Sequence, residues 1–152
     1  MTETRDAYRH FHPITTRWAD NDAFGHINNV QYYAFFDTAV TSWLVARGFL
    51  HPTQGETVCF VVETGCRFFR PLAFPEPITV GMRMAKLGTS SMRYELAVFG
   101  AEGPAAAAGH FVHVAVSRAT GRPVAPLAVP DFQAVPAMSR CAQRILAVKR
   151  LR

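Results

Sequence analysis

Residues 28–48 read NNVQYYAFFDTAVTSWLVARG, a stretch in which no proline or glycine precedes Gly48. Large apolar side chains recur in it at spacings of three and four, as at Tyr32, Phe36 and Val40. This spacing predicts one long helix over about residues 28–47, with Gly48 as its C-terminal stop. The opposite side is also apolar, with Val30, Tyr33, Ala34 and Leu44. We therefore expect the helix to be buried on most of its circumference.

The residues after this helix change to a period of two, which is typical of strands. Beyond a linker at 51–56, one strand face is expected to carry Val58, Phe60, Val62, Thr64, Cys66 and Phe68. Further strands are predicted at residues 78–87, 92–99 and 106–117, and one precedes the helix at 11–19. Because short gaps favour antiparallel hairpins, the predicted fold class is α+β, with the helix against one face of a curved antiparallel sheet.

The length and composition favour one globular domain. The chain has 152 residues, of which 49% are hydrophobic and 18% charged, unlike a disordered or fibrous protein. No apolar run approaches the roughly 18 residues of a membrane-spanning helix, and residues 1–12 lack the apolar segment of a signal peptide. We therefore expect a single domain over residues 1–152, located in the cytoplasm.

The net charge of +5 belongs to the C-terminal end of the chain. Five basic residues follow the last acidic residue, Asp131, namely Arg140, Arg144, Lys149, Arg150 and Arg152. The other eleven basic residues equal the acidic ones in number. Without an aromatic platform or a DNA-binding motif, a solvated end is favoured over a nucleic-acid or membrane site, and we predict neither partner. Residues 126–136 are expected to be extended and 138–152 to form a terminal helix.

The cysteines indicate neither a disulfide framework nor a zinc site. Cys59, Cys66 and Cys141 are odd in number and include no C-x-x-C pair, which fits a reducing compartment. If Cys59 and Cys66 share one strand, their odd separation puts them on opposite faces. We expect buried apolar thiols.

The residues just before the helix gather most of the polar chemistry of the chain. Residues 17–29 read RWADNDAFGHINN, with carboxylates, an imidazole and carboxamides at a predicted turn. The unpaired N–H groups and positive dipole end of the helix can polarise a carbonyl or hold an oxyanion beside an acid. The alternative is structural: Asp20 or Asn28 caps the helix, and His26 is a surface turn residue.

Three segments together carry a resemblance to a known family. They are DNDAFGHINN at 20–29 with QYYAFFD at 31–37, CRFFRPL at 66–72 and GTSS at 88–91. The first resembles the active-site signature of the hotdog-fold thioesterases of the 4-hydroxybenzoyl-CoA thioesterase-like family, in its G-H-x-N-N subgroup. The resemblance covers about residues 10–132 and leaves 133–152 as a basic C-terminal extension. It implies a hotdog fold, in which a curved five-stranded antiparallel sheet wraps around one long central helix and pairs with a second copy.

The resemblance also implies the site residues. Asp22 matches the catalytic aspartate, acting as nucleophile on a thioester carbonyl or as general base for water. Asn29 occupies the position whose backbone N–H receives the thioester oxygen, and His26 and Asn28 order the aspartate or the water. The implied activity is hydrolysis of an acyl-CoA thioester to free acid and CoA. No metal is required and no separate cofactor is expected, because CoA is part of the substrate.

The expected coenzyme contacts are Lys86, Ser90, Ser91 and Arg93, in and beside the segment that matches the family's hairpin near the coenzyme. This hairpin reads Gly88, Thr89, Ser90 where the best-studied family member presents basic residues to the phosphates. Arg118 or Arg122 can therefore substitute as a phosphate contact.

Four other titratable residues are candidates for a catalytic, ligand-binding or metal-binding role. Asp37 lies on the helix, where another branch of hotdog thioesterases keeps its catalytic acid, but a hydrogen-bonding role on the helix face is favoured. An ion pair of Glu63 with Arg67 is favoured over contact with a ligand across a dimer. His110 and His113 fall on opposite faces of one strand and are not expected to form a metal pair.

Two other functions stay open. One is a hotdog dehydratase or hydratase, which needs a histidine placed with an acid, although the typical His-Phe-Pro loop is missing. The other is a non-catalytic acyl-thioester binding protein. Within the thioesterase class, an acyl-carrier-protein thioester is the nearest variant substrate. The exposed edges of a five-stranded sheet, together with the resemblance, predict a homodimer or a homotetramer built from dimers.

Overall fold

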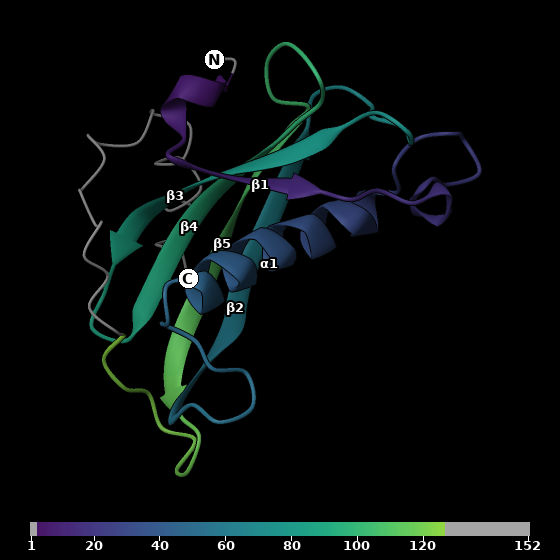
Figure 1. The fold of residues 1–152 in the computed structure, drawn as a ribbon. Helices are drawn as coiled ribbons and strands as arrows, with labels where there is room; N and C mark the ends of the chain where they lie inside the picture. Colours follow the sequence, from purple (N-terminus) through teal and green to yellow (C-terminus); the bar gives the residue numbers. More distant parts are fainter. Residues whose placement is uncertain (1–2, 127–152) are drawn as a thin grey trace, which may run out of the picture.

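The structure, a computed structural model, describes residues 3–126 of the chain (Figure 1). Its elements in chain order are η1 (Arg5–Ala7), β1 (His10–Ile14), η2 (Trp18–Asp20), α1 (Asn29–Ala46), β2 (Thr57–Phe68), β3 (Ile78–Leu87), β4 (Ser91–Phe99) and β5 (Ala107–Ser117). The predicted long helix and all the predicted strands are present, so the α+β class and the hotdog arrangement are confirmed. Cys141, most of the expected extended segment and the expected terminal helix lie outside the described residues. Between residues 3 and 126, no helix is long and apolar enough to cross a membrane.

The strands form one antiparallel sheet in the order β1-β3-β4-β5-β2. The short turn between β3 and β4 and the short connection from β4 to β5 make these strands neighbours, as predicted. β2 pairs with the far side of β5 and β1 with β3, so β1 and β2 are the two edges. α1 lies across one face of the sheet, and its backbone comes closest to β3 and β1 (Figure 1).

The first strand is shorter than predicted. β1 pairs with β3 only as far as Ile14. The chain then enters the 3₁₀ turn η2, where a carboxylate oxygen of Asp20 accepts the backbone N–H of Arg17 at 2.7 Å. This hydrogen bond closes a turn, so Trp18 belongs to the turn and not to a strand.

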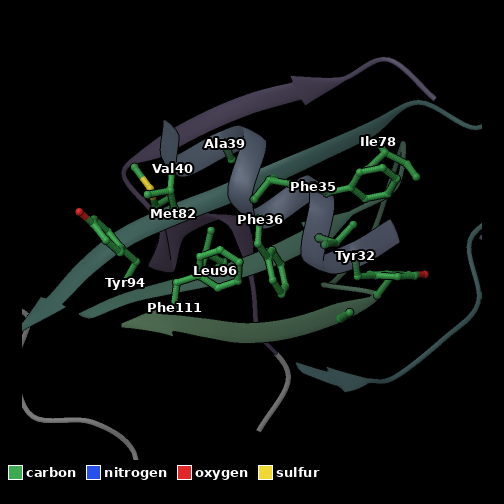
Figure 2. Close-up of a cluster of buried hydrophobic side chains, with 14 of the residues drawn as sticks. Tyr32, Phe35, Phe36, Ala39, Val40, Ile78, Met82, Tyr94, Leu96 and Phe111 are labelled. Carbon is green, nitrogen blue, oxygen red and sulfur yellow. The ribbon is translucent and has the colours of Figure 1, made fainter. Parts of the chain in front are cut away.

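The helix begins and ends where its sequence predicts. Asn28 is its N-cap, because its Oδ1 accepts the N–H of Val30 at 3.1 Å. Gly48 follows the last turn with a φ of +71°, a conformation that favours glycine. The side facing the sheet is buried and carries Tyr32, Phe35, Phe36, Ala39, Val40 and Leu44 (Figure 2).

The expectation that the helix is buried on most of its circumference is wrong for a single chain. Leu44 is buried, but Val30 is 63% exposed and Ala34 is also exposed. The reason is that the sheet covers only one side of α1. The opposite apolar side stays open along part of its length.

Aromatic rings connect α1 to the sheet. Phe36 packs edge-on against Phe111 of β5, with ring centroids 6.0 Å apart (Figure 2). Helix and sheet approach closely here because residue 109 of β5 is glycine. A Cβ at Gly109 would lie 2.6 Å from the Phe36 ring and would collide with the backbone oxygen of Gly65.

A bulge in β2 breaks the alternation that the sequence indicates. Val61 lies opposite His113 while Glu63 lies opposite Val112, so Val62 is one extra residue in the pairing with β5. The residues before the bulge therefore change faces relative to those after it. The prediction that residues 58–68 present all their even-numbered side chains on one face is wrong.

The same bulge corrects the prediction for the two cysteines. Cys59 lies opposite Ala115 and Cys66 opposite Gly109, so both thiols are on one face, toward α1. Both are half-buried and neither forms a disulfide within residues 3–126. Burial raises the pKa of both thiols, that of Cys66 to about 12. Both thiols are therefore neutral, but they are less buried than expected.

The other face of the sheet carries a second, smaller cluster made by Tyr8, Ala97, Phe99 and Ala105. The guanidinium of Arg5 lies 4.7 Å from the centroid of the Phe99 ring and donates to the carbonyl oxygen of Gly100. The N-terminal segment therefore covers one end of this face. Ion pairs between Arg83 and Glu95 and between Arg93 and Glu63 lie farther along it.

Candidate active site

The loop between η2 and α1, residues 20–28, is closed by main-chain hydrogen bonds. The N–H of Asp22 donates to the oxygen of His26 at 2.7 Å, and the N–H of Asn28 donates to the oxygen of Asp20 at 2.9 Å. Gly25 makes the tight turn between them with a φ of +80°. The predicted site residues Asp22, His26 and Asn28 are thereby held in one compact unit just before the helix.

A segment distant in sequence anchors this loop. The N–H of Ile27 donates to the oxygen of Leu72 at 2.8 Å, and both side chains are buried. The N–H of Phe74 donates to Oδ1 of Asn21 at 3.1 Å. The chain that follows β2 thus fixes the position of the loop. This contact could not be predicted from the sequence, since residues so far apart leave no local signal.

Asp20 is the structural acid of the pair. Its side chain is 1% exposed, and the Arg17 guanidinium donates to its Oδ1 from Nη2 at 2.7 Å and from Nε at 3.1 Å. Burial opposes the charge of Asp20, but the hydrogen bonds from Arg17 outweigh it and hold the pKa of this carboxyl below its usual value. The role of Arg17 was not predicted, although its spacing of three residues from Asp20 was a usable signal. Both oxygens of Asp20 are occupied inside the turn.

Asp22 has a different environment. It is only partly buried, and its Oδ1 accepts the N–H of Phe24 at 2.8 Å and that of His26 at 3.3 Å. No donor within residues 3–126 reaches its Oδ2. One oxygen therefore orients the carboxylate while the other stays available, which suits a general base or a nucleophile.

The other predicted site residues lie at the start of α1 and in the loop before it. Asn29 is the first residue of α1, and its N–H has no acceptor in the described part of the chain. This N–H is one of the unpaired donors at the positive end of the helix dipole. The side chain of Asn28 caps the helix, so the structural alternative holds for it. The imidazole of His26 is exposed.

Two large apolar side chains are exposed at this loop. Trp18 is 76% exposed and Phe24 85% exposed, and Trp18 makes an edge-on contact with Phe74 at 6.3 Å between centroids. Neither residue was among the predicted site residues. Clustered exposed aromatic residues indicate a surface that a ligand or a partner covers.

The expected coenzyme residues do not join Asp22 within one chain. Lys86, Ser90, Ser91 and Arg93 lie around the turn from β3 to β4. β3 begins beside the end of β1, where the chain leaves the sheet and enters the loop. The residues of β3 then span about 30 Å before the turn to β4. The four residues are therefore at the opposite end of the sheet.

Two of the candidate phosphate-binding arginines already have partners. Nη1 of Arg93 lies 3.5 Å from the carboxylate of Glu63. Arg118 donates to the backbone oxygens of Gly55 at 2.7 Å and Pro52 at 2.9 Å, which ties the linker before β2 to β5.

The alternative acids lie away from the loop. Glu63 is on the sheet face opposite α1, where its carboxylate is 3.1 Å from Nε2 of His110. Asp37 is exposed on α1, eight residues beyond Asn29. His110 and His113 do lie on opposite faces of β5, as predicted. Within residues 3–126 no three His, Cys, Asp or Glu side chains gather closely enough to hold a metal ion.

The chain is similar to known proteins over most of its length. A family model of the thioesterase-like superfamily matches residues 16–137. The crystal structure of the PA5185 protein from Pseudomonas aeruginosa strain PAO1 is 46% identical, with 97% of this chain and 96% of that chain covered and a TM-score of 0.80. A thioesterase from Thermus thermophilus, solved with coenzyme A and Zn, is 26% identical, with 78% and 90% covered and a TM-score of 0.64.

A second comparison, by sequence, gives a further relative. The YsmA protein from Bacillus subtilis (strain 168) is 24% identical over 122 residues, which are 80% of this chain and 82% of YsmA. The family match includes the whole loop at residues 20–28, α1 and the strands β2 to β5. The chain therefore belongs to the thioesterase-like superfamily.

Proposed function

We propose that this protein hydrolyses acyl-CoA thioesters to the free acid and CoA. The observation that carries the proposal is the Asp22 carboxylate, which has one oxygen bonded in the loop and the other open, just before the unpaired N–H of Asn29. Membership of the thioesterase-like superfamily supports a thioester substrate. The coenzyme A bound by the Thermus thermophilus thioesterase supports CoA as the leaving group.

A thioester needs little apparatus for hydrolysis, because sulfur donates little resonance to the carbonyl and thiolate is a good leaving group. The N–H of Asn29 donates to the carbonyl oxygen, and the positive end of the helix dipole stabilises the oxyanion that develops there. A water oxygen adds to the carbonyl carbon while Asp22 takes the water proton. The C–S bond then breaks, and the proton passes to the CoA thiolate.

In the alternative form of this mechanism, Asp22 itself attacks the carbonyl carbon and expels CoA, and water then hydrolyses the mixed anhydride. Mass spectrometry after rapid quenching separates the two forms. An acyl adduct on Asp22 supports the nucleophile. Turnover without any adduct, in pre-steady-state samples that show CoA release, supports the general base.

We further propose that the active unit is a homodimer formed through β2. β2 is an edge strand, and its exposed large apolar side chains are Phe60, Val61, Val62 and Phe68. A long, apolar edge strand with unpaired backbone groups pairs readily with another chain. The exposed apolar side of α1 at Val30 extends this surface.

Antiparallel pairing of β2 with the partner's β2 affects the coenzyme contacts. In such a pair, the start of the partner's strand lies beside the end of this chain's strand at Phe68. The turn at residues 88–90 is at the same end of the sheet as the start of β2, because Ser91 and Thr57 both pair near the end of β5. The partner's Lys86, the partner's Ser90, the partner's Ser91 and the partner's Arg93 are thus brought toward Asp22.

Light scattering tests the assembly. We expect twice the 16.8 kDa of one chain, or four times this mass for a pair of dimers. Val62→Arg at the bulge should lower both the mass and the turnover. A wild-type monomer that is fully active would contradict the shared site while leaving the thioesterase proposal in place.

A thiol-release assay tests the function itself. The panel contains aliphatic and aromatic acyl-CoAs and the corresponding acyl-carrier-protein thioesters, with Asp22→Asn as the control. We expect release of free CoA by the wild-type protein. Binding without release would indicate an acyl-thioester binding protein, and conversion of a hydroxyacyl-CoA to an enoyl-CoA would indicate a dehydratase. The reduced thiols of Cys59 and Cys66 fit the cytoplasmic location that we propose for the reaction.

A further inference from the structure

β5 carries a buried histidine whose hydrogen-bonding capacity is unused. His113 is 3% exposed, and neither Nδ1 nor Nε2 has a partner in the part of the chain that the structure describes. Its ring lies between aromatic neighbours, 5.4 Å from Tyr94 and 6.0 Å from Phe111 between centroids. Buried polar groups are nearly always hydrogen-bonded, so an unpartnered buried imidazole needs an explanation.

His113 lies beside a part of the sheet that the helix leaves uncovered. Its side chain points to the α1 side, because it alternates with the outward Val112 and Val114. On the neighbouring strand it is opposite Val61, which is 43% exposed. Since α1 lies closest to β3 and β1, three of the helix-facing side chains of β2 remain exposed, while Cys59 and Cys66 on the same face are half-buried. We call this surface the β2 strip, and it consists of Val61, Thr64 and Phe68.

The β2 strip runs along the helix from the end that carries the Asp22 loop. Tyr32, in the first turn of α1, contacts Phe68, with centroids 5.0 Å apart. One turn later Phe36 contacts Phe111, which is opposite Thr64. The strip then reaches Val61 and His113. A group that starts at the helix N-terminus and follows the strip therefore ends at His113.

The length of such a group follows from the strand. The β2 strip runs from Phe68, opposite Ala107, to Val61, opposite His113, and these six residues of β5 correspond to about 20 Å. An extended polypeptide advances about 3.4 Å for three bonds, so a chain of about eighteen bonds spans this distance. A long acyl group, with its thioester carbonyl at Asn29, therefore places its far end beside the imidazole.

The charges at His113 and Asp37 indicate which chemical group fits at the far end of the acyl chain. Burial lowers the pKa of His113, and the carboxylate of Asp37 opposes this effect only in part, so the imidazole is neutral at pH 7. A neutral imidazole has one donor and one acceptor nitrogen. The negative charge of Asp37 disfavours a second carboxylate there. A hydroxyl group, which both donates and accepts, matches the neutral ring.

We propose that His113 is a specificity-determining residue that binds a hydroxyl group at the far end of a long-chain acyl group. The proposal rests on the thioesterase function and adds a substrate class to it. The hydroxyl group enters the hydrogen bond that the imidazole lacks in the unliganded chain. Plain acyl chains of the same length leave His113 without a partner and are bound less well.

The test compares each terminally hydroxylated acyl-CoA with the plain acyl-CoA of the same chain length, over a series from medium to long chains. The wild-type protein, His113→Phe and His113→Leu are measured, because phenylalanine fits between aromatic neighbours if leucine does not fold. His110→Leu is the matched control, since it removes an imidazole from the opposite face of the same strand. The ratio of kcat/KM for the two substrates is the measured quantity.

We expect the wild-type ratio to favour the hydroxylated substrate by about tenfold or more at the best length, since an unpaired buried group costs roughly this factor. The ratio should approach one in His113→Phe and His113→Leu and stay at the wild-type value in His110→Leu. A wild-type ratio near one at every length, or a preference that survives in the His113 variants, would overturn the proposal.

Binding of uncleavable thioether analogues, measured by calorimetry, separates this inference from the proposed function. A protein that releases no CoA refutes the thioesterase proposal. The ratio of the two analogue affinities still tests His113 in that case. Equal affinities in the wild-type protein would exclude the hydroxyl contact whether or not the protein is an enzyme.

Discussion

Asp20 and Asp22 are two residues apart and have opposite environments. Both oxygens of the buried Asp20 carboxylate are bonded to Arg17, whereas one oxygen of Asp22 is bonded to the loop and the other is open. The loop thereby combines a rigid support with an available carboxylate. This difference gives a separate prediction for each acid.

Asp22→Asn is expected to lower kcat at least about a hundredfold and to leave the fold intact. The amide oxygen of asparagine can still accept the N–H groups of Phe24 and His26, so the loop keeps its shape. The amide is neither a base nor a nucleophile. Steady-state kinetics and a thermal melt measure the two effects. A larger loss of rate in a folded Asp20→Asn protein would mean that the wrong acid has been assigned.

Asp20→Asn is expected to lower the free energy of unfolding by about 2 kcal/mol at neutral pH, because hydrogen bonds to a buried charge are lost. The pKa of Asp20 is lower in the folded protein than its usual value, so its stabilisation is present above that usual value and is lost as the pH falls through the folded pKa. The difference between the two proteins should therefore shrink in acid. Urea unfolding at neutral and acid pH measures it, and a difference independent of pH would contradict this account.

The grouping of Asp22, His26, Asn28 and Asn29 just before the helix could be predicted from the sequence, because these residues are nearly contiguous. The separate part that each residue plays in the loop could not be predicted. It depends on which atoms bond to which, as in the cap that Asn28 makes on Val30. Whether these residues act on a substrate stays a prediction.

At the scale of elements, the close packing of α1 on the sheet depends on the absence of a side chain at Gly109. Gly109→Ala is expected to lower the free energy of unfolding by about 3 kcal/mol, because the new Cβ meets the buried Phe36 ring and the backbone of Gly65. Neither can move without disturbing the core. Chemical denaturation measures the loss.

Gly65→Ala, on the neighbouring strand, is the matched control for this effect. Its Cβ would lie 2.9 Å from Cε1 of His110, a side chain on the other face of the sheet that can rotate away. We expect a loss of about 1 kcal/mol. Equal losses in the two variants would show that the close approach of α1 to β5 does not limit stability.

The sequence predicts the bounds of α1, β3, β4 and β5 within about one residue, because period and turn signals are local. It does not predict the bulge at Val62, which depends on how β2 pairs with β5, some fifty residues away. The short β1 has a similar cause. The N–H of Arg17 donates to Asp20 and closes a turn, so the strand predicted over residues 11–19 ends early.

At the scale of the whole molecule, the predicted site is split. The acid and the helix start lie at one end of the sheet, and Lys86, Ser90, Ser91 and Arg93 lie at the other. No periodicity in one chain contains this information, because the arrangement depends on the strand order and on a second copy. The strand order is visible in the structure, while the homodimer stays a proposal.

Removal of residues 140–152 is expected to leave the turnover of a short acyl-CoA within a few-fold of the wild-type value. This segment holds five of the basic residues and lies beyond residue 137, where the family match ends. Exposed charges are screened within about 10 Å at ordinary salt, so they should not act on a carbonyl held at Asn29.

Kinetics on a truncated protein whose oligomeric state in light scattering is unchanged provide the test, and a thermal melt reports any loss of stability separately from the loss of activity. A fall in kcat/KM with unchanged kcat would indicate that the removed charges attract the coenzyme phosphates. A large fall in kcat in a folded oligomer would contradict the prediction, because it would show that the removed segment acts on the chemical step. The coenzyme contacts would then have to be assigned to Arg140 and Arg144 in place of Lys86 and Arg93, because a charge that acts on the chemical step must reach the bound thioester.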